Sequence, residues 1–441
     1  FLNVKSIATE VVKKVKNGET KFFPSSWTKT FFTWMNEIEP WCISRQIWWG
    51  HKIPVWYGPD KKIIVAKNKE EANDKALKIY KKKVNLIEET DVLDTWFSSA
   101  LWPMSTLGWP NEENIYYKKY FPTNLLVTGF DIIFFWVARM MMQSTIYTNK
   151  LPFKEIYIHA LVRDKDGQKM SKSKGNVIDP IKIIDIYGAD PLRFSLSYMA
   201  AQGRDIKLSE DVVKINRNFI TKIRNAYNFL QINNCFEYKK NNNEKLVSSE
   251  NIWLLKLTND FIKKTNINIK TYKFNEVAKD IYKFTKNIFC DWYLEFLKVA
   301  LDNKTDSNIK NELKACSTMI FKVILKLAHP IIPFITDDLY VNYIGSKNYL
   351  TEEEWPKLIN FNHDKNKVNM IENLLSIITK LRNIKSTLKI EPKNIIEVYS
   401  WTNIAKNTEF IQNNKKYIDA LARINIKNLD NNKKDNLNKE Y

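Results

Sequence analysis

The spacing of apolar residues changes near position 207. Before that position, short apolar runs alternate with turns that contain glycine, proline or aspartate, a pattern typical of buried strands. The run at 156–162 leads into such a turn at 164–167. The segment 128–142 fits a strand that ends at Gly129 and a buried helix that starts near Asp131. The first part of the chain is therefore predicted to adopt an α/β fold.

After position 207, apolar residues recur every three or four positions, which is the period of an amphipathic helix. Ser209 is placed to cap the first of these helices, and acidic residues follow it. The apolar stripe of this helix is predicted to comprise Val212, Ile215, Phe219, Ile223, Tyr227 and Leu230. The same period continues until Pro330 and Pro333 interrupt it. The pattern therefore predicts a helical bundle at 207–345.

Two smaller patterns complete the predicted fold. Residues 346–441 combine an amphipathic helix near 371–388 with a short strand near 395–399, which predicts a small α/β extension. Between the two main regions, Asp190 and Pro191 fit the N-cap and the first position of a helix. We expect that helix to support the polar loop that precedes it.

The most distinctive polar motif is KMSKS at 169–173, on a loop beyond the strand predicted at 156–162. Lys169 and Lys172 place two ammonium groups three positions apart among small hydroxyl residues, and a glycine that permits a tight turn follows them. Ligands of open α/β sheets bind beyond the carboxyl ends of the strands. The loop therefore suits a polyphosphate, although the two lysines alone favour a solvated loop in a lysine-rich chain.

The whole stretch, KMSKS followed by GNVIDP, resembles the second signature of the class I aminoacyl-tRNA synthetases. In that family the loop closes over ATP, which implies ATP with Mg²⁺ as a cosubstrate and no covalent enzyme nucleophile. The resemblance assigns Lys172, together with Lys169, to the pyrophosphate leaving group. It implies further contacts with ATP from Gly129, Asp131, His159, Met170, Ser171 and Ser173. His159 also fits a core histidine with satisfied hydrogen bonds.

Two tryptophan-rich segments concern the amino acid that such an enzyme would select. RQIWWGHKIP and TWFSSALWP resemble the valine-specific members of the family, with the isoleucine- and leucine-specific members as the alternative. The resemblance places Trp49 and Trp96 at the side chain of valine and Asp91 at its ammonium group, with Asp94 as the other candidate for the ammonium. A carboxylate beside an apolar wall suits an aliphatic amino acid. A tryptophan-rich corner of the core is the structural alternative.

Composition adds a basic charge and no metal site. Lysine and arginine exceed aspartate and glutamate by 69 − 49, or +20, which attracts polyanions, although lysine is abundant everywhere in the chain. The resemblance implies tRNA(Val) as a partner of the helical bundle, with Arg217 and Arg224 as phosphate contacts or as residues of a solvated helix face. Four dispersed cysteines and four dispersed histidines predict free thiols, a reducing compartment and no structural metal. Charged residues interrupt the most apolar segment, 125–147, so we expect a cytoplasmic monomer without a membrane span.

The resemblance also predicts four regions and one departure from the family. The regions are a connector from an editing domain at 1–34, a Rossmann-like α/β catalytic portion with the KMSKS loop at 35–206, an all-α anticodon-binding domain at 207–345, and a small α/β extension at 346–441. The departure is that the His-x-Gly-His signature does not occur in the 441 residues. We therefore expect a piece of a longer enzyme, inactive alone, without the half that carries this signature and without the editing domain. A non-catalytic tRNA-binding remnant is the alternative.

Overall fold

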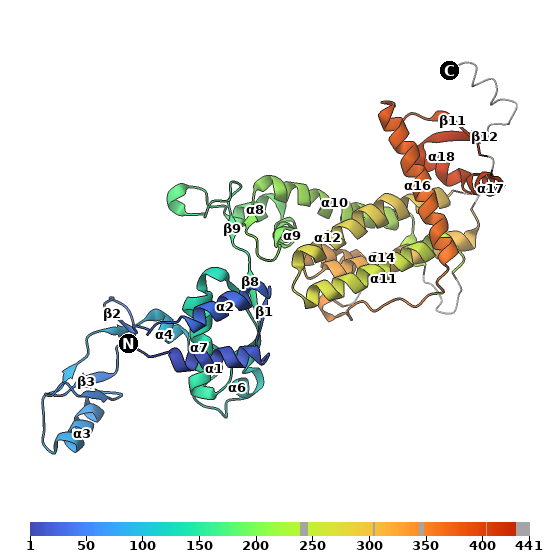
Figure 1. The fold of residues 1–441 in the computed structure, drawn as a ribbon. Coiled ribbons are helices and arrows are strands. Elements are labelled where there is room, and N and C mark those ends of the chain that lie inside the picture. The colour runs from blue at the N-terminus through green and yellow to red at the C-terminus, as the bar shows by residue number, and fades with distance from the viewer. Residues whose placement is uncertain (239–245, 303–304, 344–347, 403, 429–441) are drawn as a thin grey trace. The chain divides into compact units, whose positions relative to one another are not determined.

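The computed structural model describes residues 1–238, 246–302, 305–343, 348–402 and 404–428, and the side chain of Lys172 lies outside the described part. The chain forms two compact units. The N-terminal unit consists of Phe1–Leu161 together with Gln202–Asp205, and the C-terminal unit consists of Val162–Ala201 together with Ile206–Tyr441. The elements of each unit are labelled in Figure 1.

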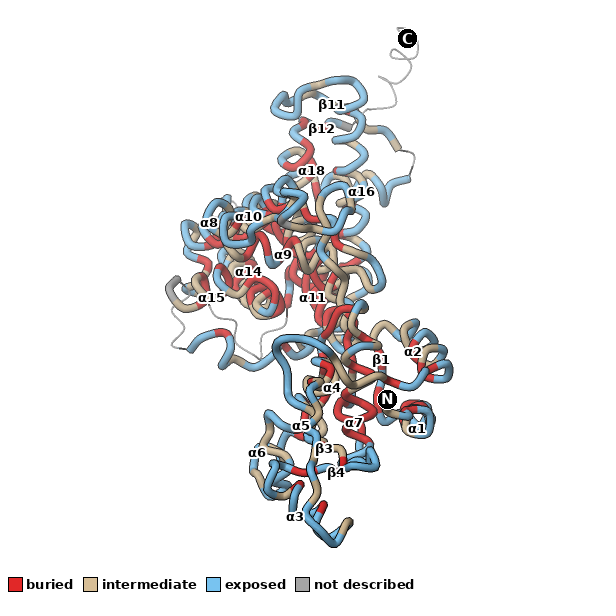
Figure 2. Tube along the Cα trace, turned by 90° about the vertical axis from the view of Figure 1, so that its left-hand side faces the viewer, coloured by how far each residue is buried: buried red, intermediate tan, exposed pale blue. Residues whose placement is uncertain are grey.

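A parallel three-stranded sheet with the order β1-β8-β7 forms the centre of the N-terminal unit. Its strands are β1 (Lys21–Phe23), β8 (Phe153–His159) and β7 (Thr123–Gly129). Helix α1 (Lys5–Lys16) packs against α2 (Ser26–Asn36) and α7 (Ala138–Thr148) beside this sheet. Figure 2 shows buried residues concentrated along α7. Fully buried side chains of this core include Val11, Phe31, Met140, Met141 and Ile156.

A smaller antiparallel sheet with its own core lies in the same unit. Strand β3 (Val55–Tyr57) pairs with β4 (Ile63–Val65) and β5 (Ile87–Glu88), and α3 (Lys69–Tyr80) covers the sheet through buried alanines. Asn68 caps α3 because its side-chain oxygen accepts a hydrogen bond from the Glu71 amide at 2.9 Å. The remaining short elements are β2 (Ser44–Arg45), β6 (Val92–Leu93), α4 (Thr95–Ser99), α5 (Trp102–Ser105) and α6 (Ile115–Tyr120).

The most apolar segment of the sequence runs from β7 into α7. The helix that was predicted to start near Asp131 begins as a 3-10 turn at Phe130–Ile132 and a π-helical turn at Ile133–Val137, and regular α-helix begins only at Ala138. Among the described residues, no helix is long and apolar enough to cross a membrane.

Helices make up most of the C-terminal unit. They are α8 (Pro180–Tyr187), α9 (Ala189–Met199), α10 (Glu210–Ile232), α11 (Ser249–Lys270), α12 (Phe274–Tyr282), α13 (Leu294–Ala300), α14 (Ser307–Ala328) and α15 (Pro333–Asp338), with a π-helical segment at Lys283–Tyr293. One core joins them, and its fully buried aromatic residues include Tyr227, Phe289, Tyr293 and Phe321. The structure thus confirms helices within the predicted bundle.

Helix α10 confirms the helix predicted after Ser209 but shifts the start of its buried stripe. Val213 is fully buried, whereas Ile215, which was predicted to face the core, is 64% exposed. From Phe219 onward the predicted stripe is correct, since Ile223, Tyr227 and Leu230 are buried. Two adjacent valines, of which only the second is buried, made the phase of the first turn ambiguous.

The last described residues form a small α/β layer. Helix α16 (Lys365–Thr387) packs on α11 and on α18 (Lys415–Ala422), and β11 (Ile396–Ser400) pairs in parallel with β12 (Ile424–Asn428). Helix α17 (Ala405–Asn413) precedes α18. The helix and strand predicted near 371–388 and 395–399 are therefore confirmed. The boundaries of the four predicted regions stay a prediction, and residues 1–34 contribute α1, β1 and α2 to the N-terminal unit.

The prediction that Asp190 caps its own helix is wrong. Helix α9 has Gly188 as its N-cap, with φ of 93°, so Asp190 lies in the first turn. The Asp190 carboxylate instead accepts hydrogen bonds from the amides of Phe334 at 3.2 Å and Ile335 at 2.7 Å, and thereby caps α15. Burial raises the pKa of Asp190 above its usual range.

Arg193, one turn further along α9, binds the chain just before α15. Its Nε donates to the Ile331 carbonyl and its Nη2 to the Pro330 carbonyl, both at 3.0 Å. Together the two side chains attach α9, the second helix after the KMSKS loop, to the end of α14 and the start of α15. A cap from another helix cannot be read from local sequence, which explains the error.

Replacing Asp190 by Ala should destabilise the C-terminal unit by about 1–3 kcal/mol, because the buried amide of Ile335 and the half-buried amide of Phe334 lose their acceptor. Urea denaturation followed by circular dichroism measures this change. Asp185→Ala is the matched control, since Asp185 is exposed on the neighbouring helix α8 and should change stability by less than about 0.5 kcal/mol. Equal denaturation midpoints for the two variants would show that the cap contributes nothing.

Candidate functional site

The carboxyl ends of β7 and β8 form one candidate site, in the N-terminal unit. Gly129 pairs with His159 in the ladder, so the two strands end at the same level. A Cβ atom on Gly129 would meet Asp131 Oδ1 at 2.6 Å and His159 Cε1 at 3.6 Å, so only glycine fits here without a shift. The structure therefore brings together Gly129, Asp131 and His159, three of the residues predicted to contact ATP.

The ring of His159 has a defined tautomer. His159 Nδ1 lies 2.9 Å from the Ala160 carbonyl oxygen, which can only accept, so Nδ1 carries the proton. In the neutral ring, Nε2 is then a free acceptor for a hydroxyl or amino group of a ligand.

A cavity of about 280 Å³ lies beside His159. Trp27 and Phe130 stack in its wall, with ring centroids 5.7 Å apart and planes inclined by 10°. The segment Gly203–Asp205 adds Arg204, an exposed cation. Flat aromatic walls beside a hydrogen-bonding ring and a guanidinium suit a heteroaromatic ring that carries an anionic group. Sequence reasoning missed Trp27 and Arg204, since neither lies near a recognised motif.

A second candidate site, described by itself, is the KMSKS loop, which we define as residues 164–178, in the C-terminal unit. It follows β9 (Val162–Arg163), which pairs in parallel with β10 (Ile206–Lys207). Lys169 is exposed, and Lys172 begins a 3-10 turn that ends at Lys174. The loop thus presents Lys169 to solvent from an anchored base. Of the predicted ATP contacts, Met170 and Ser171 are half-buried and Ser173 is exposed.

Asp164 organises the start of the loop. Its Oδ1 accepts hydrogen bonds from the amides of Asp166 at 3.1 Å and Gln168 at 2.7 Å, and its Oδ2 accepts one from Asn176 Nδ2 at 2.8 Å. The bond from Asn176 and that from the Gln168 amide hold the pKa of Asp164 below its usual range. The carboxylate is therefore ionised at neutral pH and holds the turn predicted at 164–167.

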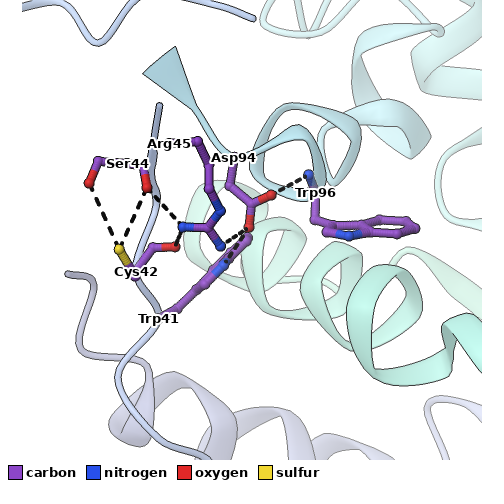
Figure 3. A network of polar contacts seen from close by, with 6 residues as sticks. All are labelled: Trp41, Cys42, Ser44, Arg45, Asp94 and Trp96. Carbon is purple, nitrogen blue, oxygen red and sulfur yellow. Dashed lines mark hydrogen bonds and ion pairs between the residues drawn. The ribbon is translucent and has the colours of Figure 1, made fainter. Parts of the chain in front are cut away.

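The predicted amino-acid pocket centres on Asp94, whose carboxylate is fully engaged (Figure 3). Asp94 Oδ2 accepts from Trp41 Nε1 at 2.9 Å and from Arg45 Nη2 at 3.0 Å, and Oδ1 accepts from the Trp96 amide at 3.2 Å. Asp94 is buried, and Arg45 balances its charge. We therefore infer that Asp94 stabilises the packing of this corner. Among the described residues, the Asp91 carboxylate accepts a hydrogen bond from Gln46 Nε2 at 2.6 Å, and Asp91 stays the predicted ligand of the ammonium group.

The two predicted tryptophans have different surroundings. Trp96 is half-buried and packs near Phe135, with ring centroids 6.1 Å apart. Trp49 is 88% exposed, and Trp48 beside it is 98% exposed. The described residues do not bring Trp49 into contact with Trp96, so the role of Trp49 in a pocket stays a prediction.

Arg139 is a second, half-buried cation near Asp94. Its guanidinium stacks on Trp41 at 4.1 Å and on Trp34 at 5.3 Å from the ring centroids. Burial lowers the pKa of Arg139 to about 10, against the opposing attraction of Asp94. This aromatic cage makes the corner around Asp94 a rigid wall.

The C-terminal unit carries the predicted contacts to tRNA. Arg217 is exposed on α10, whereas Arg224 Nη2 forms an ion pair with Asp338 at 2.8 Å. Sequence reasoning missed a basic cleft of about 760 Å³ between α16 and the end of α18, lined by Arg382, Lys385, Lys389, Lys393 and Arg423. Four of its five cations lie at 382–393, a local cluster that the sequence could have revealed.

Lys385 is the buried member of this basic cleft. It is 5% exposed, and its Nζ donates to the carbonyls of Asn394 at 2.6 Å, Arg423 at 3.1 Å and Ala422 at 3.4 Å. It thereby caps the carboxyl end of α18, where a cation is favourable. Of the other cations, Arg382 Nε donates to the Leu421 carbonyl at 2.9 Å and Lys393 forms an ion pair with Glu391 at 3.0 Å, whereas no side-chain partner is described for Lys389 or Arg423.

Thiols and metal ligands add no further site. All four cysteines are free, and burial raises the pKa of Cys290 to about 12, so that thiol is inert. Within the described ranges, no group of three or more histidine, cysteine, aspartate or glutamate side chains is placed to hold a metal ion.

Two family models match the regions that carry these features. A model of class I tRNA synthetases for isoleucine, leucine, methionine and valine matches residues 1–209, and a model of the anticodon-binding domain of tRNA ligases matches residues 251–400. Residues 1–209 therefore match the class I tRNA synthetases, and residues 251–400 match their anticodon-binding domain. The predicted fold class, a Rossmann-like α/β portion followed by an all-α anticodon-binding domain, is confirmed.

Relatives of this chain include valine–tRNA ligases. That of Pelagibacter ubique is 48% identical over 435 residues, which cover 98% of this chain and 49% of the relative. That of Bartonella henselae is 45% identical over 394 residues, which cover 88% of this chain and 43% of the relative. The chain thus spans about half the length of the relatives it matches.

Solved structures agree on the fold. A leucyl-tRNA synthetase of Agrobacterium radiobacter, in a ternary complex with tRNA and LeuAMS, matches with a TM-score of 0.57 at 16% identity and covers 86% of this chain and 47% of its own. Methionyl-tRNA synthetase of Mycobacterium tuberculosis, bound by methionyl-adenylate, matches with a TM-score of 0.59 at 15% identity and covers 76% and 62%.

Proposed function

We propose that this chain is part of a valine–tRNA ligase, which activates valine with ATP and transfers it to tRNA(Val). The observation that carries the proposal is the 48% identity to a valine–tRNA ligase over 98% of the chain. The glycine, carboxylate and histidine gathered at the ends of β7 and β8, and the ordered KMSKS loop, supply groups that this reaction needs. The enzyme is proposed to act as a cytoplasmic monomer.

The reaction has two steps. A carboxylate oxygen of valine attacks the α-phosphorus of ATP, the bond from that phosphorus to the bridging oxygen breaks, and pyrophosphate leaves. A hydroxyl of the terminal ribose of tRNA then attacks the valyl carbonyl, its proton is lost, and AMP leaves. Both steps gain mainly from positioning and from stabilisation of the charge that develops on phosphate oxygens.

Each group of residues has a proposed part in the first step. The ammonium groups of Lys169 and Lys172 stabilise the charge of the departing pyrophosphate, and Mg²⁺ arrives with the ATP phosphates that are its preferred ligands. Close approach of the ribose at Gly129 lets Asp131 accept its hydroxyl hydrogens, and His159 Nε2 accepts beside it. Asp91 would hold the ammonium of valine, while Trp49 and Trp96 would enclose its side chain.

The proposed contact with tRNA involves the helical unit. Arg217 on α10 is free of described ion pairs, whereas Arg224 would have to leave Asp338 to meet a phosphate. The basic cleft adds Lys389, whereas Lys393 would have to leave Glu391 to meet a phosphate. Phosphate contacts of this kind give affinity and orientation without reading sequence.

For the variants below, activity is measured with a two-part enzyme. It combines this chain with the separately expressed remainder of the Pelagibacter ubique relative, because the chain matches only 49% of that protein. The assay is valine-dependent exchange between ATP and pyrophosphate.

Lys172→Ala should lower the turnover of this exchange by about 10²- to 10³-fold while the KM for valine stays nearly unchanged, because the ammonium opposes charge that grows in the transition state. Lys165→Ala is the matched control, an exposed lysine of the same loop. An equal loss in the control would show that the assignment of the loop is wrong.

Trp96→Ala should raise the KM for valine about tenfold and weaken discrimination against alanine, since an apolar contact of this size is removed. Trp102→Ala is the control, because Trp102 lies on the next short helix and is 45% exposed. Unchanged kinetics with both amino acids would assign Trp96 to the core alone.

The chain by itself should bind tRNA in a salt-sensitive manner and should not catalyse the exchange. Binding follows from the net charge of +20, with a logarithmic salt slope of about −0.7 to −0.9 per neutralised phosphate. Filter binding at several salt concentrations measures the slope, which Lys389→Ala should reduce by about one and Lys69→Ala on α3 should leave unaltered.

The expected inactivity follows from the resemblance, which implies that both KMSKS and His-x-Gly-His hold ATP. The 441 residues contain KMSKS and no His-x-Gly-His. Recovery of exchange in the two-part enzyme alone would support the proposal. Exchange by the chain alone would contradict the expected inactivity, and tRNA binding without exchange in either form would favour a tRNA-binding remnant.

A further inference from the structure

Asn176, three residues after the KMSKS motif, closes the loop by three hydrogen bonds. Its Oδ1 accepts from the Ser171 amide at 2.9 Å, and its Nδ2 donates to Asp164 Oδ2 at 2.8 Å and to the Lys169 carbonyl at 3.3 Å. The three partners agree on one orientation of the amide, since two are acceptors and one is a donor.

These bonds fix both sides of the motif. The Lys169 carbonyl and the Ser171 amide flank Met170, so Asn176 sets the backbone direction at the start of KMSKS. Asp164 lies on the N-terminal side of the motif. It accepts hydrogen bonds from the amides of Asp166 and Gln168 and so holds the chain just before KMSKS. Residues 164 and 176 are thereby connected through side chains across the whole motif.

Little apolar packing supports this loop. Lys169, Ser173, Lys174 and Gly175 are exposed, and Val177 is 50% exposed. The order of the loop therefore depends on its polar contacts, in which Asp164 and Asn176 make the largest share of the described bonds.

We propose that Asp164 and Asn176 form a positioning pair that sets the KMSKS loop for adenylate formation. The pair acts through the loop backbone and touches no substrate. The inference rests on the proposed function, because the loop needs a defined geometry only if its lysines serve a reaction. A misplacement of about 1 Å in such a group can cost about 10²-fold in rate.

Exchanging the two residues gives an isosteric test. In Asn176→Asp, a carboxylate faces the carboxylate of Asp164, and two acceptors oppose each other. In Asp164→Asn, the side-chain oxygen must still accept from the amides of Asp166 and Gln168, so its NH₂ group faces the NH₂ group of Asn176. Each single variant therefore breaks the central bond without a change in side-chain size.

The double variant Asp164→Asn with Asn176→Asp restores the bond in the reverse direction. The NH₂ group at 164 then donates to the carboxylate at 176, which still accepts from the Ser171 amide. Only the 3.3 Å bond to the Lys169 carbonyl is lost. A single hydrogen bond contributes about 0.5–1.5 kcal/mol, so recovery to within about threefold to tenfold of the wild type is expected.

The first measurement is amide hydrogen exchange of the chain itself, read by mass spectrometry on peptides that span 164–178. Exchange at Gln168 and Ser171 should be faster in both single variants and return towards the wild-type rate in the double variant. Melting temperatures should be equal in all four proteins, since the loop lies outside the buried core. Unaltered exchange in the single variants would overturn the inference.

The second measurement is valine-dependent pyrophosphate exchange with the two-part enzyme. Each single variant should lower the turnover roughly 10- to 100-fold with the KM for valine unchanged, and the double variant should recover it. Lys165→Ala, in the same loop and outside the pair, should retain wild-type turnover.

The outcomes separate the inference from the proposed function. Absence of exchange by the wild-type two-part enzyme would contradict the proposed function, and the inference with it. Two outcomes would overturn the positioning pair alone, given normal pyrophosphate exchange by the wild-type two-part enzyme. Either the single variants leave the pyrophosphate exchange unchanged, or the double variant fails to recover it.

Discussion

The parallel pairing of β7 with β8 is the constraint on which the N-terminal unit depends. Gly129 opposite His159 brings both strands to an end at one level, so residues 30 positions apart meet beside Asp131. A residue other than glycine at 129 would collide with the Asp131 carboxylate unless that side chain moved. The register of β7 with β8 therefore determines the strand pairing and also which polar residues meet at the carboxyl edge of the sheet.

The same principle, polar groups fixed by neighbours that the fold supplies, explains Asp94 and Asp164. Asp94 is buried and needs a counter-charge, which Arg45 supplies, together with the Trp41 indole N–H. Asp164 is open to solvent and gains its order from backbone amides and from Asn176. The first carboxylate stabilises a packed corner of the protein, and the second arranges a loop that little else supports.

The sequence predicted the helices and strands better than it predicted the contacts between them. The strand before KMSKS, α10 and α16 followed from the local spacing of apolar residues. The cap of α15 by Asp190 did not, because its partners lie more than 140 positions away. The π-helical turn at Ile133–Val137 was also missed, since apolar periodicity gives no sign of a shift in backbone hydrogen bonds.

The candidate site shows a different limit. A motif assigns a role to a residue by its resemblance to other proteins, whereas the structure shows only the contacts that this chain makes with itself. Trp49 illustrates the difference, because the motif assigns it to a pocket while the structure leaves it 88% exposed. The base of its loop is nevertheless fixed, since a Cβ on the adjacent Gly50 would meet Val92 Cγ2 at 2.8 Å. Exposure of the apolar Trp49 indole to water is unfavourable in free energy. Contact with a second apolar surface would remove this cost. The chain spans about half the length of the relatives it matches, and the pocket role that the motif assigns to Trp49 stays a prediction.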